Sequence, residues 1–173
     1  MAVEATGKMS LPLFYLRATV AGSSTFQTWV SADDATEALD SIYVVSVDKP
    51  TAGWSSILPF AVVDWADNLS FRSYAGGIAN EFTQSGDLFL TLWSAVDPTH
   101  SDADAAMTFL NTVGAIEAEM ELLAGLGGYL DISEITRESG PSRPMDDEAE
   151  TSGDVYEMVL RISYGQGGAG GAE

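Results

Sequence analysis

Cysteine is absent from this sequence of 173 residues. The chain therefore forms no disulfide and offers no thiolate for catalysis, for an iron–sulfur cluster or for a cysteine-ligated zinc ion. The absence is in keeping with synthesis in a reducing compartment. Histidine occurs once, as His100. Cysteine and histidine, two side chains much used in nucleophilic and metal chemistry, are thus absent and single, respectively.

Basic residues are scarce as well. Seven lysines and arginines stand against 26 aspartates and glutamates, for a formal net charge of −19. A field of that sign repels phosphate, which argues against nucleic-acid binding through phosphate neutralisation. Either the charge keeps the protein soluble, including in a salty environment that screens acidic surfaces, or it lets a surface face DNA without adhering to it. Composition alone favours the first interpretation.

Long apolar runs are missing too. No stretch approaches the ~20 consecutive apolar residues of a membrane-spanning helix, so we expect no membrane association. Glu4 comes early and the pattern of a signal peptide is lacking, so we expect a cytoplasmic product. Apolar residues make up 46% of the chain, enough for the packed core of one domain. We place this domain at residues 1–165 and expect the glycine-rich residues 166–173 to form a flexible tail.

Four segments carry the patterns of helices: 11–21, 25–30, 35–42 and 101–124. The first has Pro12 near its start, where a first helical turn tolerates proline; its aromatic and β-branched residues leave a strand as the alternative. The last is the strongest prediction, because Ser101 is a capping residue and apolar residues then recur every three or four positions. Glycines from Gly125 onward end it.

Six segments carry the patterns of strands: 43–47, 57–65, 70–74, 87–96, 129–135 and 155–164. The first is either a strand or an extended tail to the helix before it. Because proline cannot donate a backbone hydrogen bond, Pro59 indicates that the segment 57–65 is either an edge strand or a strand whose pairing begins after the proline. We expect residues 70–74 to pair with that strand. Residues 87–96 are apolar on both faces and are expected at the centre of the sheet.

Two loops complete the pattern. Residues 75–86 bear glycines, and residues 138–153 are too long and too polar for a tight hairpin. Helices are followed by strands, then one long helix and two more strands. This order predicts an α+β fold, in which a mostly antiparallel sheet of about four to six strands carries the long helix, 101–124, and the N-terminal helices on one side.

Few side chains suggest chemistry. His100 adjoins Ser101 and acidic residues, but neighbours in sequence at a strand-to-helix junction seldom point at one another, so we interpret it as a solvated loop residue. Glu117 and Glu121 lie one helical turn apart, and we interpret them as a solvated helix face and not as a catalytic pair. The acids of 146–150 lack the spacing of a calcium loop. We therefore expect no enzymatic activity, no metal and no cofactor.

The glycine-rich segments lack the patterns that bind phosphate groups in a strand–helix context. Tryptophans are most simply explained as core residues. Trp54 is the exception, because it stands between polar residues in a loop, and we single it out as an anchor for a partner.

A series of short segments runs through the chain in a familiar order. In the first half these are Ser24-Thr25-Phe26-Gln27, residues 35–43 and Leu58-Pro59-Phe60-Ala61-Val62-Val63. In the second half they are Gly86-Asp87-Leu88, a helix bearing residues 109–116, Gly128-Tyr129-Leu130-Asp131-Ile132, a proline-bearing loop, Asp154-Val155-Tyr156 and Tyr164-Gly165. Across about residues 11–165, this order resembles that of the tail terminator (tail completion) proteins of long-tailed bacteriophages.

The resemblance implies a structural virion protein of the viral tail and neck. It implies a homo-hexameric ring that caps the head-proximal end of the tail tube, ends polymerisation of the tube protein and provides the docking surface for the head. The partners would be other copies of the chain, the tail tube protein and a neck or head-completion protein, with DNA passing through the lumen without specific binding. The protein would assemble in the host cytoplasm. The family supplies no catalytic residues.

Alternatives to this function are another neck component, such as a head-completion or connector protein, and a soluble acidic accessory or binding protein. In a ring, like-charged copies must meet through apolar and aromatic surface, with acids at the rim and lumen. Loops that order on contact are the candidates for binding tube or neck partners. The candidate contact residues are Trp54, Gly76, Gly77, Ile78, Phe82, Pro141, Arg143, Pro144 and Met145.

Overall fold

The structure is a computed structural model that describes residues 10–44, 57–66, 72–76, 81–96, 101–142 and 155–165. These residues form an α+β fold, as the sequence predicts. The helical elements are α1 (Ser10–Gly22), α2 (Ser24–Trp29), α3 (Ala35–Ala38), the 3-10 turn η1 (Leu39–Ser41) and α4 (Asp102–Leu123). The strands are β1 (Ile42–Val44), β2 (Phe60–Trp65), β3 (Arg72–Gly76), β4 (Glu81–Ala95), β5 (Ile132–Ser142) and β6 (Val155–Gly165).

The helices begin at side chains that satisfy their first backbone N–H groups. Ser23 caps α2 by accepting a hydrogen bond from the N–H of Phe26, and Asp34 caps α3 by accepting from two N–H groups. Ser101 caps α4, as expected from the sequence. The helix ends before Gly125, whose φ of 74° suits glycine and few other residues.

The strands form one six-stranded sheet in the order β1-β2-β4-β6-β5, with β3 pairing with β4 outside this path. The pair β1–β2 is parallel and the other pairs are antiparallel. The predicted strand at 87–96 is part of β4, which lies at the centre as expected. Pairing of β2 begins at Phe60, after Pro59, which is one of the two possibilities that the proline left open.

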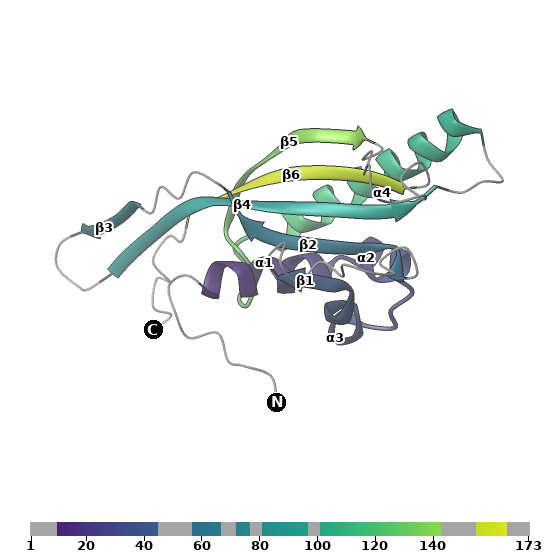
Figure 1. Cartoon of the computed structure of the whole chain (residues 1–173). Helices are drawn as coiled ribbons and strands as arrows, with labels where there is room; N and C mark the ends of the chain where they lie inside the picture. Colours follow the sequence, from purple (N-terminus) through teal and green to yellow (C-terminus); the bar gives the residue numbers. More distant parts are fainter. Residues whose placement is uncertain are drawn as a thin grey trace.

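The helices cover one face of the sheet, and Figure 1 shows α1, α2 and α4 behind the strands. Side chains from this face of β4 and β6 are buried against the helices, including Leu90 and Leu160. The buried side of α4 supplies Val113, Ile116 and Met120 to the same core. Burial of this continuous apolar layer is the main source of stability, at roughly 25 cal/mol for each Å² of apolar surface removed from water.

Three predictions about the strands were wrong. Strand β3 pairs with β4, not with β2. The predicted loop at 75–86 instead contains the end of β3 and the first six residues of β4, residues 81–86. Gly86, taken as a loop residue, lies inside β4 because Tyr164 on β6 fills its space: a Cβ at this position would lie 3.1 Å from the Tyr164 hydroxyl.

Two further boundaries differ from prediction. Ile42 was assigned to the helix 35–42, but it is buried and opens β1, where it pairs with Ala61. The strand predicted at 129–135 starts at Ile132 and continues to Ser142, so the first part of the predicted loop 138–153 is strand. Pairing with β6 over a long register overrides the local glycine and proline signals there. The predicted tail, 166–173, lies outside the described residues.

Candidate functional site

A hairpin arm, β3 with the first part of β4, leaves the body of the sheet. Strand β4 is 15 residues long, and its first residues pair only with β3, from Gly76 opposite Glu81 to Arg72 opposite Ser85. From Ser85 onward it pairs with β6, and from Leu88 onward also with β2. Figure 1 shows the arm reaching away from the helices at one end of the sheet. One continuous strand thus connects the arm to the core.

The arm brings together two of the predicted contact residues. Gly76 ends β3, and Phe82 lies on β4 opposite Ala75, the residue before Gly76. The predicted contacts Gly77 and Ile78 fall between the two strands, outside the described residues.

The second group of predicted contacts falls at the end of β5, which is an edge of the sheet. Pro141 is exposed there. Gly140 next to it has a φ of 100°, and a Cβ would lie 2.5 Å from the carbonyl oxygen of Glu157. Only glycine fits so close to β6. Trp54, Arg143, Pro144 and Met145 lie outside the described residues.

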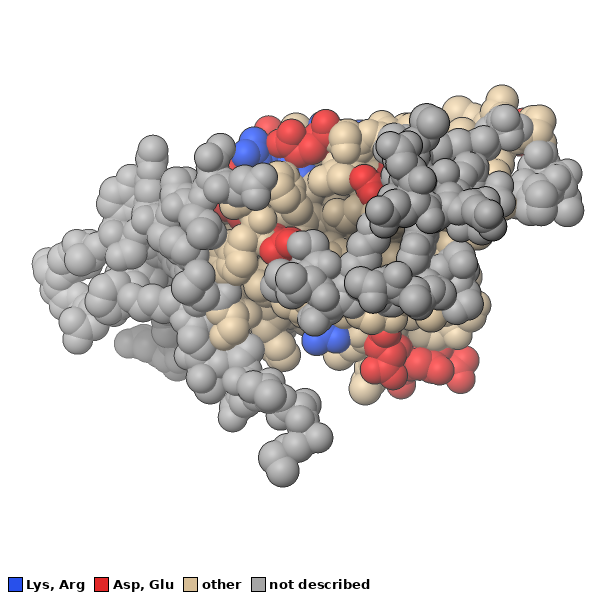
Figure 2. Space-filling model, in the orientation of Figure 1, with Lys and Arg blue, Asp and Glu red and all other residues tan. Residues whose placement is uncertain are grey.

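The sheet face opposite the helices combines a buried end with a partly exposed middle. At the buried end Phe60, Val62, Trp93 and Val155 pack together, and the rings of Phe60 and Trp93 stack with centroids 6.0 Å apart. The middle is made by residues such as Thr91 of β4 and its partner Val159 of β6, which are half-buried. In Figure 2 uncharged residues occupy much of the described middle of this face.

Charged side chains form an ion-paired cluster on this side of the sheet. Arg161 of β6 lies 3.0 Å from a carboxylate oxygen of Glu138 and 3.7 Å from one of Asp87. Asp87 also accepts a hydrogen bond from the hydroxyl of Ser163. On the helix side of the sheet, burial, with Asp87 nearby, raises the pKa of Tyr164 to about 12. The cluster joins β4, β5 and β6 where the arm leaves the sheet.

The carboxylate pair considered for catalysis does not form a shared site. Both oxygens of Glu117 accept hydrogen bonds from Arg137 of β5, at 3.2 and 3.0 Å. Glu121 is exposed. His100 lies outside the described residues, and within the part of the chain that the structure describes no three metal-ligating side chains come together.

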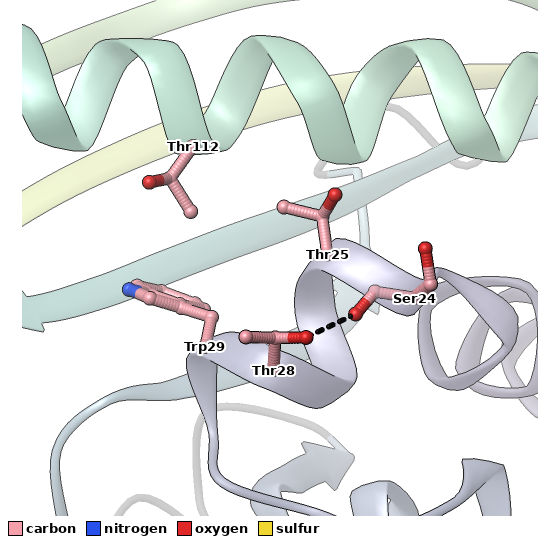
Figure 3. A pocket seen from close by; sticks show the side chains of 5 residues that line it. All are labelled: Ser24, Thr25, Thr28, Trp29 and Thr112. Atoms are coloured by element: carbon pink, nitrogen blue, oxygen red, sulfur yellow. Dashed lines mark hydrogen bonds between the residues drawn. The ribbon is translucent and has the colours of Figure 1, made fainter.

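A shallow hollow of about 320 Å³ lies between α2 and α4. Figure 3 shows its lining, which is made by Ser24, Thr25, Thr28, Trp29 and Thr112. The hydroxyl groups of Thr28 and Thr112 donate their hydrogens to backbone carbonyls one turn earlier. Those of Ser24 and Thr25 donate to Glu119. The hollow therefore presents hydroxyl oxygens as acceptors, beside an indole ring.

Glu119 fastens α2 to α4. Its carboxylate accepts hydrogen bonds from the hydroxyls of Ser23, Ser24 and Thr25 and from the N–H of Thr25, at 2.7 to 3.0 Å. Burial raises the pKa of Glu119, but these hydrogen bonds outweigh it and bring the pKa to about 2. The positive end of α2 adds to the attraction. The carboxylate is thus a structural anion that holds the two helices together.

Sequence reasoning missed both the arm and this carboxylate. Glu119 was not among the residues singled out on the helix 101–124, although the run Ser23-Ser24-Thr25 before a short helix is a signal for an N-terminus that can accept an anion. For the arm the signal was weak, since only Phe82 and Thr83 favour a strand and Gly86 argues against one.

Two comparisons of the sequence with known proteins give no match. No protein-family model fits the sequence. No curated protein matches it either. Among the described residues, no helix is both long and apolar enough to cross a membrane. Function must therefore be argued from the residues and their arrangement.

Proposed function

We propose that this chain is a structural assembly protein that caps the head-proximal end of a phage tail tube as a ring of identical copies. The ring ends polymerisation of the tube protein and offers the surface on which the head docks. Its role is contact between copies and neighbouring proteins, without a catalytic step. The order of sequence segments that resembles tail terminator proteins supplies the class of protein, and the geometry supplies the means of contact.

The observation that carries the proposal is the hairpin arm. A two-stranded hairpin alone is marginally stable in water. This one is nonetheless continuous with the central strand of the sheet, from Glu81 to Ala95. An arm that extends beyond the body of its own chain is suited to lie on a neighbouring copy, as rings require. The half-buried middle of the sheet face, around Thr91 and Val159, is a suitable surface to receive it.

The charge of the chain supports the same role. Copies that each carry −19 repel one another, so their contacts must exclude most of the acids. In a ring the remaining acids would face the lumen and the rim. A negative lumen guides DNA by repulsion and does not bind it.

Shortening the arm tests the proposal. Removing Tyr74 and Ala75 from β3 together with their partners Thr83 and Phe82 from β4 keeps the pairing register and the alternation of faces. We expect the variant to fold, because the pairs of β4 with β2 and β6 are untouched. It should fail to end tube growth, and electron microscopy should show tubes of irregular length without heads.

The control is the wild-type chain in the same preparation, with thermal unfolding of both proteins measured in parallel. Tails of uniform length that join heads in the presence of the folded, shortened variant would contradict the role of the arm. If particles without any copy of this chain still made uniform, head-bearing tails, capping itself would be ruled out. Labelled protein found on heads before tails attach, and not on free tails, would point to a head-completion protein instead.

A further inference from the structure

The hollow between α2 and α4 is lined by four hydroxyl groups whose hydrogens are already used. The hydroxyls of Ser24 and Thr25 donate to the carboxylate of Glu119. Those of Thr28 and Thr112 donate to backbone carbonyl oxygens of their own helices. A hydroxyl has one hydrogen to donate and two lone pairs that accept. Each of the four oxygens can therefore accept a hydrogen bond from a ligand, and none of them has a hydrogen left to offer.

The charges on the two helices that line the hollow are all negative. Neither α2 nor α4 contains a lysine, an arginine or a histidine. On α4, Asp104 lies about two turns before Thr112 and Glu119 about two turns after it. Although burial raises the pKa of Glu119, its hydrogen bonds bring the pKa to about 2, so the carboxylate is ionised at neutral pH. The field at the hollow therefore attracts a cation and repels an anion.

The remaining lining of the hollow is apolar. The indole ring of Trp29 is held in place by two other rings, with its centroid 5.9 Å from that of Phe26 and 6.3 Å from that of Phe109. Figure 3 shows the methyl groups of the three lining threonines directed toward the space beside this indole ring. The hollow thus combines an aromatic ring and methyl groups with oxygens that accept hydrogen bonds.

The size of the hollow indicates how much of a ligand it can take. Sites that enclose a small molecule measure about 300–1,000 Å³, and this hollow, at about 320 Å³ and shallow, is at the lower end. It suits one long side chain better than a cofactor. Arginine matches its lining, because the hydrocarbon stem packs on apolar surface and the flat guanidinium stacks on tryptophan. The guanidinium also carries five N–H donors and no acceptor.

We propose that the hollow between α2 and α4 binds the guanidinium group of an arginine side chain from a partner protein. The group stacks on the indole ring of Trp29 and donates hydrogen bonds to hydroxyl oxygens such as that of Thr112, and Glu119 supplies the negative charge nearby. A chain of charge −19 attracts basic surfaces in general, and the hollow gives one arginine of such a surface a defined place. This contact does not depend on the proposed tail function.

Two small compounds of matched shape test the proposal. N-acetyl-arginine amide carries the guanidinium, and N-acetyl-citrulline amide replaces one of its nitrogens by oxygen and is neutral. Each is titrated into the ¹⁵N-labelled protein, and the indole N–H signal of Trp29, identified by its loss in Trp29→Phe, is followed by nuclear magnetic resonance. We expect the arginine compound to shift this signal saturably and the citrulline compound to bind at least about tenfold more weakly.

Thr112→Val is the matched variant, because valine keeps the shape of threonine and removes only the acceptor oxygen. The affinity for the arginine compound should fall by about two- to tenfold, and thermal unfolding checks that the variant is folded. Thr136→Val, at an exposed position on β5, is the control and should bind like the wild type.

Three results would overturn the proposal: equal binding of the two compounds, signal shifts that spread over the acidic surface without saturating, or unchanged affinity in Thr112→Val. None of them would affect the tube-capping test.

Discussion

At the scale of single residues, Glu119 is the polar group on which most depends. Four hydrogen bonds converge on its carboxylate from the start of α2. Charge-assisted bonds of this kind are roughly twice as strong as neutral ones. The residue is only partly buried, so water screens part of the effect. Its contribution is to fix the position of α2 on α4, and with it the hollow that contains Trp29.

This arrangement predicts a pH-dependent loss of stability. The pKa of Glu119 falls from its ordinary value of 4.5 to about 2 on folding, so the folded chain binds fewer protons than the unfolded one between these values. The stabilisation is present above about pH 4.5 and is lost as the pH falls towards 2. Glu119→Gln should lower the free energy of unfolding at pH 7 by about 1–2 kcal/mol.

Urea unfolding of wild type and variant from pH 7 to pH 2.5 checks this expectation. The difference between the two proteins should shrink as the pH falls. Glu121→Gln, an exposed change two residues away on the same helix, should behave like the wild type at every pH. A constant difference for Glu119→Gln across this range would contradict the assignment.

At the scale of elements, α4 has one buried face and one exposed face. Val113, Ile116 and Met120 are fully buried against the sheet, whereas Met107 and Leu122 are exposed. The buried face supplies the apolar area that stabilises the fold.

Truncating a side chain to alanine should affect the free energy of unfolding strongly on the buried face of α4 and weakly on its exposed face. Ile116→Ala should lower the free energy of unfolding by about 2–5 kcal/mol, because it leaves a cavity in the core. Met107→Ala should change it by less than about 0.5 kcal/mol, because the side chain is exposed. Chemical denaturation of both variants measures the two changes. A large loss of stability for Met107→Ala would contradict the exposed position of its side chain.

At the scale of the whole molecule, the net charge of −19 opposes both compactness and association. Described arginines such as Arg137 and Arg161 are each engaged by acids. Because basic residues are few, most acids have no positive partner. Exposed acids such as Asp33, Asp131 and Glu134 repel one another through water. The Debye length falls from about 30 Å at 0.01 M salt to about 3 Å at 1 M, so added salt should remove much of this repulsion.

We therefore expect salt to raise the free energy of unfolding. Between about 0.01 M and 1 M sodium chloride, the wild type should unfold at progressively higher urea concentration. A variant with Glu121→Gln, Asp131→Asn and Glu134→Gln, all exposed, should show a smaller salt dependence. Equal salt dependence in both proteins would show that the surface acids are not the cause.

The sequence by itself determined the features that depend on neighbouring residues. Apolar spacing and capping at Ser101 fixed α4 almost to the residue, and strict alternation fixed β6. Local periodicity is enough there, because one face of each element must be buried. The tail-capping role rests on the order of these segments and stays a prediction.

Only the tertiary structure decided the contacts between distant parts of the chain. Glu119 and Thr25 are 94 positions apart, and no local sequence pattern at either residue indicates that they are in contact. Local sequence predicts a loop at Gly86. In the structure Gly86 lies in β4, and the ring of Tyr164 from β6 occupies the space that a side chain at this position would need. The arm forms because β4 extends beyond the residues that pair with β2 and β6, and its first residues pair with β3. The choice of strand partner, and the surface left for other molecules, follow from packing that no local pattern contains.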